Sequence, residues 1–316
     1  MSSSPLLSAQ SLSHYYGTHL AVNNVSFDIY KGEVLGFLGP NGAGKSTTMK
    51  MLSGNLAPNH GQIMINGYDL LRQPKQAKAH IGYLPEHPPL YKELTVKEFL
   101  YFCAKINLIS SKHINSAINI AIERCGLSDM TKRLIGNLSK GYQQRVGIAQ
   151  AIIHTPAVVI LDEPTSGLDP IQIREIRHLI RDIASEHSVI LSTHILPEVQ
   201  MLCDRVQIIS RGQLIFNDTT TGLNKQRQAS NLLCTLLSPP PLAALQQIIG
   251  VITVDTLNPT QFRLHYQPEI NPTAELLSRA VTQQWQLTEL MPEQHSLEDV
   301  FMNIIQQESS IVEQTI

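Results

Sequence analysis

Residues 39–46 read Gly39-Pro40-Asn41-Gly42-Ala43-Gly44-Lys45-Ser46. They match the pattern Gly-x4-Gly-Lys-Ser/Thr, which is typical of loops that bind the phosphates of nucleotides. The glycines let consecutive backbone N–H groups curl around phosphate oxygens, and the helix that follows presents the positive end of its dipole. We expect Lys45 to reach the β- and γ-phosphates and the Ser46 hydroxyl to bind Mg²⁺. We also expect Thr47, the next residue of the predicted helix, to contact the nucleotide.

The segments around this loop predict an α/β fold. An apolar strand at residues 34–38 precedes the loop, and a helix is expected at 45–52. Farther along, apolar runs at 158–161 and 189–192 enclose a predicted helix at 171–185. Uninterrupted apolar strands between helices indicate a mostly parallel sheet that is covered on both faces. This context makes a glycine-rich turn that binds nothing an unfavourable alternative.

Two further regions complete this first part of the chain. Short strands at 12–16 and 25–29, and alternation at 62–66 before Asn66-Gly67, predict an antiparallel β part near the N-terminus. Residues from about 92 to 150 are helical in pattern, and Thr95 with Glu98 forms a capping box at their start. The expected helices are 95–105, 111–125 and 138–153, and a closing hairpin is expected from 206–210 and 213–216.

The balance of charged residues and the order of predicted strands and helices both change near Lys225. Residues 1–224 carry 20 Lys and Arg against 17 Asp and Glu, whereas residues 225–316 carry 4 against 9. The pattern then restarts in the order β-α-β-β-α-β of a ferredoxin-like split βαβ unit, with a last helix from Ser296. We therefore expect a first domain at 5–224 and a small acidic α+β domain, accessory or regulatory, at 225–316. Its strands are expected at 231–236, 251–257, 261–266 and 286–290, and its helices at 241–249 and 273–285.

Bulk composition excludes several kinds of protein. The net charge of −2, without a basic run, gives no electrostatic reason to expect a nucleic-acid partner. The four cysteines lie too far apart for a CxxC metal site, and we expect them to be free thiols in a reducing cytosol. No signal peptide is indicated, and no apolar run approaches the roughly 20 residues that span a bilayer. Any role at a membrane would therefore depend on a partner.

Two adjacent acids, Asp162 and Glu163, end the apolar strand at 158–161. Ligands of parallel sheets bind at the carboxyl ends of the strands. Asp162 suits a Mg²⁺ shell, and Glu163 suits a general base for an attacking water. Alone, such a pair would more often be a solvated strand end or a helix cap. Together with the phosphate loop, the functional interpretation is favoured.

Residues 138–145 read Leu138-Ser139-Lys140-Gly141-Tyr142-Gln143-Gln144-Arg145. This segment resembles the signature of ABC ATPases, which is found in the ATP-hydrolysing subunits of ABC transporters and their relatives. The resemblance covers about residues 5–220 in the family's motif order. It implies the ABC-ATPase fold of P-loop NTPases, with ATP and Mg²⁺ as cofactors.

The resemblance also implies roles for single residues. Tyr16 stands where the family stacks an aromatic ring on adenine, with Tyr15 or a core aromatic as alternatives. Ser139 and Gly141 would face the γ-phosphate of ATP held by a second ATPase subunit, in a head-to-tail dimer. Asp169 ends a segment that looks like the family's D-loop, at the dimer interface. His194 looks like the switch histidine that contacts the γ-phosphate.

One position departs from the family's pattern. The family usually has Gln where this chain has Glu86. A carboxylate can still bind Mg²⁺, but it adds negative charge and lacks a donor. The resemblance further implies that residues 86–91 border the groove for an integral membrane permease, which places the chain at the cytoplasmic face of the membrane. In having an acidic residue at this position together with an added C-terminal domain, the chain resembles bacterial exporter-type ATPases, including gliding-motility and multidrug members.

Two other function classes stay open at this point. One is a non-transport ABC ATPase that acts on a ribosome or nucleic acid, although such proteins usually carry two cassettes or basic insertions. The other is a nucleotide-gated regulatory module with little turnover. Small-molecule kinases are disfavoured, because an acceptor site would compete with the dimeric arrangement. The sequence does not identify the transported substrate, because the permease would contact it.

Overall fold

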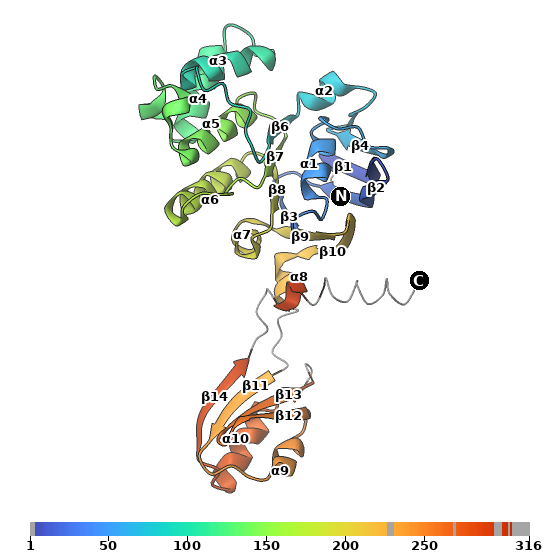
Figure 1. The fold of residues 1–316 in the computed structure, drawn as a ribbon, viewed down its shortest axis with the longest axis vertical. Helices are drawn as coiled ribbons and strands as arrows, with labels where there is room; N and C mark the ends of the chain where they lie inside the picture. The colour runs from blue at the N-terminus through green and yellow to red at the C-terminus, as the bar shows by residue number, and fades with distance from the viewer. Residues whose placement is uncertain (1–3, 226–230, 268–269, 294–298, 303, 305–316) are drawn as a thin grey trace. The chain divides into compact units, whose positions relative to one another are not determined.

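The loop at 39–46 follows a central strand of a six-stranded sheet with the order β10-β9-β3-β8-β7-β6 (Figure 1). Strands β6, β7, β8, β3 and β9 run parallel, and β10 is antiparallel at the edge. Their bounds are β3 Val34–Leu38, β6 Ile81–Leu84, β7 Val158–Asp162, β8 Ser188–Thr193, β9 Arg205–Ser210 and β10 Gln213–Thr219. Every residue of β3, β7 and β8 is buried, as expected for strands covered on both faces. The predicted parallel sheet is confirmed.

The computed structural model describes residues 4–225, 231–267, 270–293, 299–302 and 304. The chain divides into two compact units, residues 1–220 and 221–316. Helix α8 (Thr220–Lys225) starts at this division, and the boundary expected after residue 224 lies at its end. Among the described residues, no helix combines the length and apolar character that a bilayer crossing requires.

A second sheet in the first unit is antiparallel, with the order β2-β1-β4-β5. It contains β1 Leu7–Tyr16, β2 His19–Ile29, β4 His60–Ile65 and β5 Tyr68–Asp69. Its inner side chains share one core with β3 and with helix α1 (Lys45–Leu52), and the rings of Phe27 and Phe37 lie 5.7 Å apart there. The predicted antiparallel part is confirmed, but β1 and β2 start several residues earlier than expected.

Three helices form the group predicted between residues 92 and 150: α3 Val96–Ile106, α4 Ile114–Arg124 and α5 Lys140–Ile152 (green in Figure 1). The capping box before α3 is present. Glu98 N–H donates to Thr95 Oγ1 at 3.3 Å, and Thr95 N–H donates to Glu98 Oε2 at 2.9 Å. Short 3₁₀ turns at Ser128–Met130 and Ile135–Asn137 lead into α5.

Helix α6 (Pro170–Ala184) confirms the helix expected at 171–185. The strand β6, the short helices α2 (Pro74–Lys78), α7 (Leu196–Leu202) and α8, and the two 3₁₀ turns before α5 were not predicted. Helix α7 begins shortly after His194, the predicted switch histidine that follows β8, so its position affects the site.

The second unit is a four-stranded antiparallel sheet with the order β12-β13-β11-β14. The strands are β11 Asn231–Leu236, β12 Val251–Asn258, β13 Gln261–Tyr266 and β14 Leu287–Glu293, and the helices are α9 Leu242–Gln246 and α10 Thr273–Thr282. Alternate residues of β11 and β13 are buried, and they share one core with Leu245 of α9 and Leu276 of α10. Both helices therefore cover one face of the sheet. The predicted β-α-β-β-α-β order is confirmed. The expected start of the last helix at Ser296 lies outside the described residues, and residues 299–302 are helical.

Candidate functional site

A pocket of about 490 Å³ opens where β3, β7 and β8 end. The loop after β3, Glu163 after β7 and His194 after β8 meet there, because the carboxyl ends of parallel strands lie along one edge of a sheet. The pocket is lined by Tyr16, His19, Ala21, Asn41, Gly42, Gly44, Lys45, Ser46, Thr47, Glu86, Glu163, Ser166 and His194. Most residues proposed from the sequence are thus gathered in one place.

The backbone of the loop depends on glycine. Gly42 has φ 80° and Gly44 has φ 106°, a left-handed region that is open mainly to glycine. A Cβ on Gly44 would also lie 2.6 Å from the carbonyl oxygen of Ala21. Gly44 is the N-cap of α1, so the unpaired N–H groups of the first turn of that helix face the loop.

Three predicted loop residues shape the loop without lining the pocket. Gly39 and Pro40 contribute carbonyl oxygens that accept from Lys45. Ala43 is buried, its N–H donates to Pro40 O at 3.2 Å, and its carbonyl accepts from Gly212 N–H at 2.9 Å. Their contribution is to hold the curvature of the loop.

Lys45 lies inside this curve. Its Nζ donates to Gly39 O at 2.8 Å and to Pro40 O at 3.3 Å, and it lies 3.3 Å from Glu163 Oε1. The side chains of Lys45 and Glu163 are only 6% and 8% exposed. The ammonium is therefore held at the base of the pocket by two carbonyls and one buried carboxylate.

Glu163 has a strained backbone, with φ 48° in a residue that is not glycine. Its N–H donates to Ser192 O at 2.9 Å, and its carbonyl accepts from Ser166 N–H at 3.1 Å. The Oε2 atom lies 2.8 Å from Nδ1 of His194, whose side chain is 46% exposed. Glu163 therefore links Lys45 on one side to a half-open histidine on the other.

Asp162 is buried and does not itself line the pocket, but Ser46, which does, donates from Oγ to Asp162 Oδ1 at 3.2 Å. Burial raises the pKa of Asp162, the neighbouring hydroxyls of Ser192 and Ser46 oppose this effect, and the carboxylates of Glu163 and Glu86 add to it. A hydroxyl with nearby carboxylates is the all-oxygen set that Mg²⁺ prefers, and a cation there would offset the mutual repulsion of the acids. The residues present therefore fit a magnesium ion.

Tyr16 lies at the mouth of the pocket and is 48% exposed, with its ring 4.7 Å from that of His14 in an edge contact. Tyr15 does not belong to the lining. Ser166 also lines the pocket and belongs to the segment ending at Asp169, which was expected at the dimer interface. Two further lining residues, His19 and Ala21, were not proposed from the sequence. Both lie on β2, opposite the end of β1, and their position depends on a pairing between Tyr16 and His19 that no local pattern reveals.

Ser139 and Gly141 start α5 and do not line this pocket. Ser139 Oγ accepts from Tyr142 N–H at 3.4 Å, so Ser139 is the N-cap of the helix. A Cβ on Gly141 would lie 2.7 Å from the Gln172 side chain. Within one chain the structure does not bring these two residues to the loop at 39–46.

Asp169 is also outside the lining and caps α6, where its Oδ1 accepts from Ile171 N–H at 3.0 Å and from Gln172 N–H at 2.9 Å. We expect Asp169→Ala to lower the free energy of unfolding by about 1 kcal/mol, because two N–H groups lose their acceptor. Asp169→Asn keeps an oxygen acceptor and should lower it by a few tenths at most. Chemical denaturation of both variants measures this difference, and an equal loss in the two would contradict the capping role.

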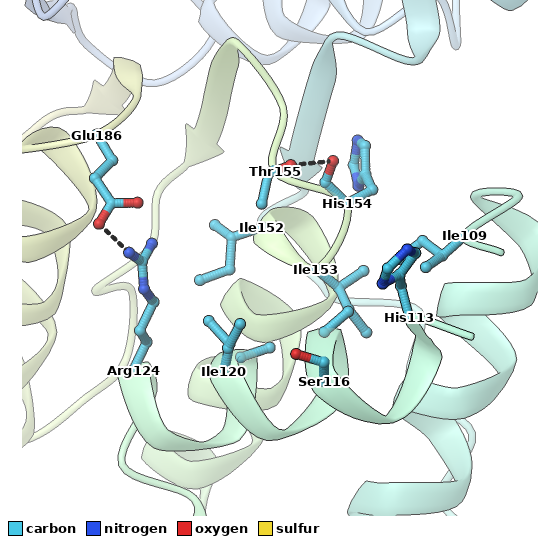
Figure 2. A pocket seen from close by; sticks show the side chains of 12 residues that line it. Ile109, His113, Ser116, Ile120, Arg124, Ile152, Ile153, His154, Thr155 and Glu186 are labelled. Atoms are coloured by element: carbon cyan, nitrogen blue, oxygen red, sulfur yellow. Dashed lines mark hydrogen bonds and ion pairs between the residues drawn. The ribbon is translucent and has the colours of Figure 1, made fainter. Parts of the chain in front are cut away.

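A second cavity, of about 400 Å³, lies between α4 and the end of α5 (Figure 2). Figure 2 shows Ile120, Ile152 and Ile153 along its walls and Arg124 paired with Glu186 at one side. None of the described residues expected at the nucleotide site lines this cavity. Its charged groups neutralise each other, so it offers no comparable cluster of reactive side chains.

Comparison with known proteins identifies relatives, one of which matches almost the whole chain. Residues 22–166 match the family described as "ABC transporter". The ABC transporter ATP-binding protein YxlF of Bacillus subtilis (strain 168) is 35% identical over 302 residues, which are 95% of this chain and 99% of YxlF. The bacitracin transport ATP-binding protein BcrA of Bacillus licheniformis is 42% identical over 214 residues, which are 67% of this chain and 69% of BcrA. A solved structure of an ATP-binding subunit of an ABC transporter matches with a TM-score of 0.64 and 32% identity, covering 70% of this chain and 92% of its own.

These relatives agree with the resemblance that the signature segment indicated. They support ATP binding and ATP hydrolysis coupled to transport, and they give no support to a role on ribosomes or nucleic acid. ABC ATP-binding subunits work with membrane permease components. This chain therefore belongs to the ABC transporter ATP-binding family, as the subunit that binds and hydrolyses ATP to drive transport.

Proposed function

We propose that the pocket at the ends of β3, β7 and β8 binds ATP with Mg²⁺ and that Glu163 is the general base of hydrolysis. One observation carries this assignment. The Glu163 carboxylate contacts Lys45 Nζ at 3.3 Å and His194 Nδ1 at 2.8 Å. A carboxylate placed between a phosphate-binding lysine and a histidine can take a proton from water beside a γ-phosphate.

The remaining groups divide the work of binding. Lys45 and the N–H groups of the loop bind the β- and γ-phosphates, and Tyr16 stacks on the base. Ser46 and Asp162, with Glu86 nearby, hold Mg²⁺, which supplies positive charge against the phosphate oxygens. His194 keeps Glu163 in place and contacts the γ-phosphate.

We further propose that two ATPase subunits pair head to tail. Each would cover the nucleotide of the other with the N-terminal end of its α5 helix. The position of Ser139 and Gly141 supports this, because they are at a helix N-terminus and outside the pocket of their own chain. Asp169, at the start of α6, would lie at the same interface.

The chain's permease is proposed to dock beside α3. Tyr91 is 51% exposed and Phe102 is 40% exposed, and their rings lie 5.3 Å apart. Exposed aromatic side chains in contact with each other are typical of protein interfaces. Closure of the dimer would move this helical region against the permease, and binding there would keep the subunit at the cytoplasmic face of the membrane. We propose export as the direction of transport, in keeping with the resemblance to exporter-type members that Glu86 and the added C-terminal domain indicate.

The head-to-tail arrangement can be tested through the charge at Ser139. Ser139→Asp keeps a capping oxygen for α5 but places a negative charge against the γ-phosphate of the facing subunit. With a non-hydrolysable ATP analogue and Mg²⁺, dimer formation should weaken roughly a hundredfold, as like charges meet at a dry interface. Ser139→Asn is the neutral control and should dimerise far better. Analytical ultracentrifugation measures both, and equal dimerisation of the two variants would contradict the proposal.

A further inference from the structure

Glu198 is a fully buried carboxylate on α7, and both of its oxygens are used. Oε1 accepts from Thr165 Oγ1 at 2.7 Å and from Arg177 Nη2 at 3.3 Å. Oε2 accepts from Thr193 Oγ1 at 2.8 Å. The motifs read from the sequence do not include Glu198, and it does not line the nucleotide pocket.

The three donors belong to the three segments that carry the proposed reaction groups. Thr165 is two residues after Glu163, in the turn that follows β7. Thr193 is the last residue of β8 and directly precedes His194. Arg177 lies on α6, the helix that Asp169 caps. Glu198 therefore joins all three segments at one point behind the pocket.

The turn that carries His194 is fixed from two sides. The Thr193 hydroxyl donates to Glu198 and accepts from Ile195 N–H at 3.0 Å. The backbone at Glu163, in the adjacent segment, is strained, with φ 48°, and needs surrounding contacts to hold that conformation. Thr165 and Thr193 are both almost completely buried, so water cannot replace the carboxylate as their partner.

The charge of Glu198 also limits what could replace it. Its carboxylate accepts three bonds, one from a guanidinium, which offsets the burial of the negative charge. A glutamine side chain has nearly the same size but only one acceptor atom. With its oxygen towards Thr165 and Arg177, its NH₂ group would have to donate to Thr193 Oγ1, so the Thr193 O–H would lose its own acceptor and Arg177 would lose its ion-pair partner.

We propose that Glu198 is a positioning residue for ATP hydrolysis, which holds Glu163 and His194 at the separation that their 2.8 Å contact requires. It acts through the two threonine hydroxyls and does not touch the nucleotide. This inference rests on the proposed role of Glu163 as general base. A buried partner behind a reacting group commonly sets its orientation, and small displacements of that group reduce the rate steeply.

The test separates turnover from binding in Glu198→Gln. We expect kcat for ATP hydrolysis to fall about tenfold, because Glu163 and His194 lose their fixed separation. KM and ATP affinity should stay within about twofold, because the phosphate loop is untouched. Glu33→Gln is the matched control: Glu33 is 12% exposed and pairs with Arg205 at 2.9 Å, before the start of β3 and outside the pocket lining. It removes a charge of the same kind and should keep the wild-type kcat.

A double-mutant cycle with His194→Ala tests whether Glu198 acts through the histidine. In that background Glu198→Gln should lower kcat by less than about twofold, since the contact between Glu163 and His194 whose separation it sets is gone. A full tenfold loss there, or wild-type kcat in folded Glu198→Gln, would overturn the proposal. If Glu198→Gln does not fold, Thr193→Val removes one hydroxyl at nearly constant volume, and its kcat should fall while KM holds. An unchanged kcat in that variant overturns the proposal equally.

The outcome also distinguishes this inference from the proposed function. If Glu163→Gln loses turnover and Glu198→Gln does not, only the positioning role is wrong. If Glu163→Gln itself turns over normally, the assignment of the base fails, and the positioning role fails with it.

Discussion

Replacing Glu163 by glutamine should lower kcat for ATP hydrolysis by about a thousandfold while leaving nucleotide binding intact. An amide oxygen cannot accept a proton from water at neutral pH, so the base is lost. The substitution hardly changes side-chain size, and the backbone at φ 48° is as strained for Gln as for Glu. The loss therefore reports on the carboxylate alone. Steady-state hydrolysis gives kcat, and calorimetric titration with MgATP gives the affinity.

The geometry predicts that ATP affinity of this variant does not fall. In the structure the Glu163 carboxylate pairs with Lys45 Nζ at 3.3 Å, in competition with a phosphate. Removing the carboxylate leaves the ammonium to the phosphates, so affinity should be equal or higher. Glu175→Gln, which alters an exposed partner of Arg145 outside the pocket lining, is the control and should hydrolyse ATP at the wild-type rate. Near-normal turnover in Glu163→Gln would remove Glu163 as the base.

The candidate site could be predicted largely because its motifs are contiguous in sequence. The loop at 39–46 encodes its own geometry through glycines, and Glu163 and His194 each directly follow an apolar strand. Adjacent parallel strands end at one edge, so the two side chains meet. The ion pair between Lys45 and Glu163 was not foreseen, since it depends on the depth of the loop below the strand ends.

Residues supplied by long-range packing could not be predicted. His19 and Ala21 reach the pocket through the pairing of β1 with β2, whose register shifts several times. Glu198 lies on α7, a seven-residue helix with Pro197 in its first turn, which is too short to give a clear amphipathic pattern. The local sequence does not distinguish a glutamate on an exposed helix surface from one in a buried hydrogen-bond network. The packing of α6 against α7 decides which of the two Glu198 is.

The sequence predicts the order of the strands and helices well and the residues at which they end less well. The helix expected at 273–285 stops at Thr282, and Gln284 and Gln286 then take φ of 57° and 52°. This turn places Trp285 in the core of the second unit, where it is 3% exposed. Burial of one large side chain outweighs the helical preference of its neighbours, and a local pattern does not contain that information.

Replacing Lys45 by alanine should weaken MgATP binding by about a hundredfold or more, the second large effect that this site predicts. The variant loses a charged donor to the phosphates in a pocket where the lysine is 6% exposed. It also leaves Glu163 without its ion-pair partner, so the phosphates meet uncompensated negative charge. Fluorescent-nucleotide titration measures the loss. Lys50→Ala, at an exposed position of the same helix, is the control and should bind as the wild type does.

A second substitution shows how much of that loss comes from repulsion. In the double variant Lys45→Ala/Glu163→Gln, the unpaired carboxylate is removed together with its lysine partner. If Glu163 repels the phosphates once Lys45 is gone, affinity should recover by about tenfold relative to Lys45→Ala, because one buried like charge has been removed. Lys45→Ala with Glu175→Gln should show no recovery, since Glu175 is half exposed and outside the pocket lining. Wild-type binding by Lys45→Ala would contradict the assignment of the loop itself. An absent recovery would instead mean that Lys45 acts on the phosphates alone and that its contact with Glu163 has no effect on nucleotide affinity.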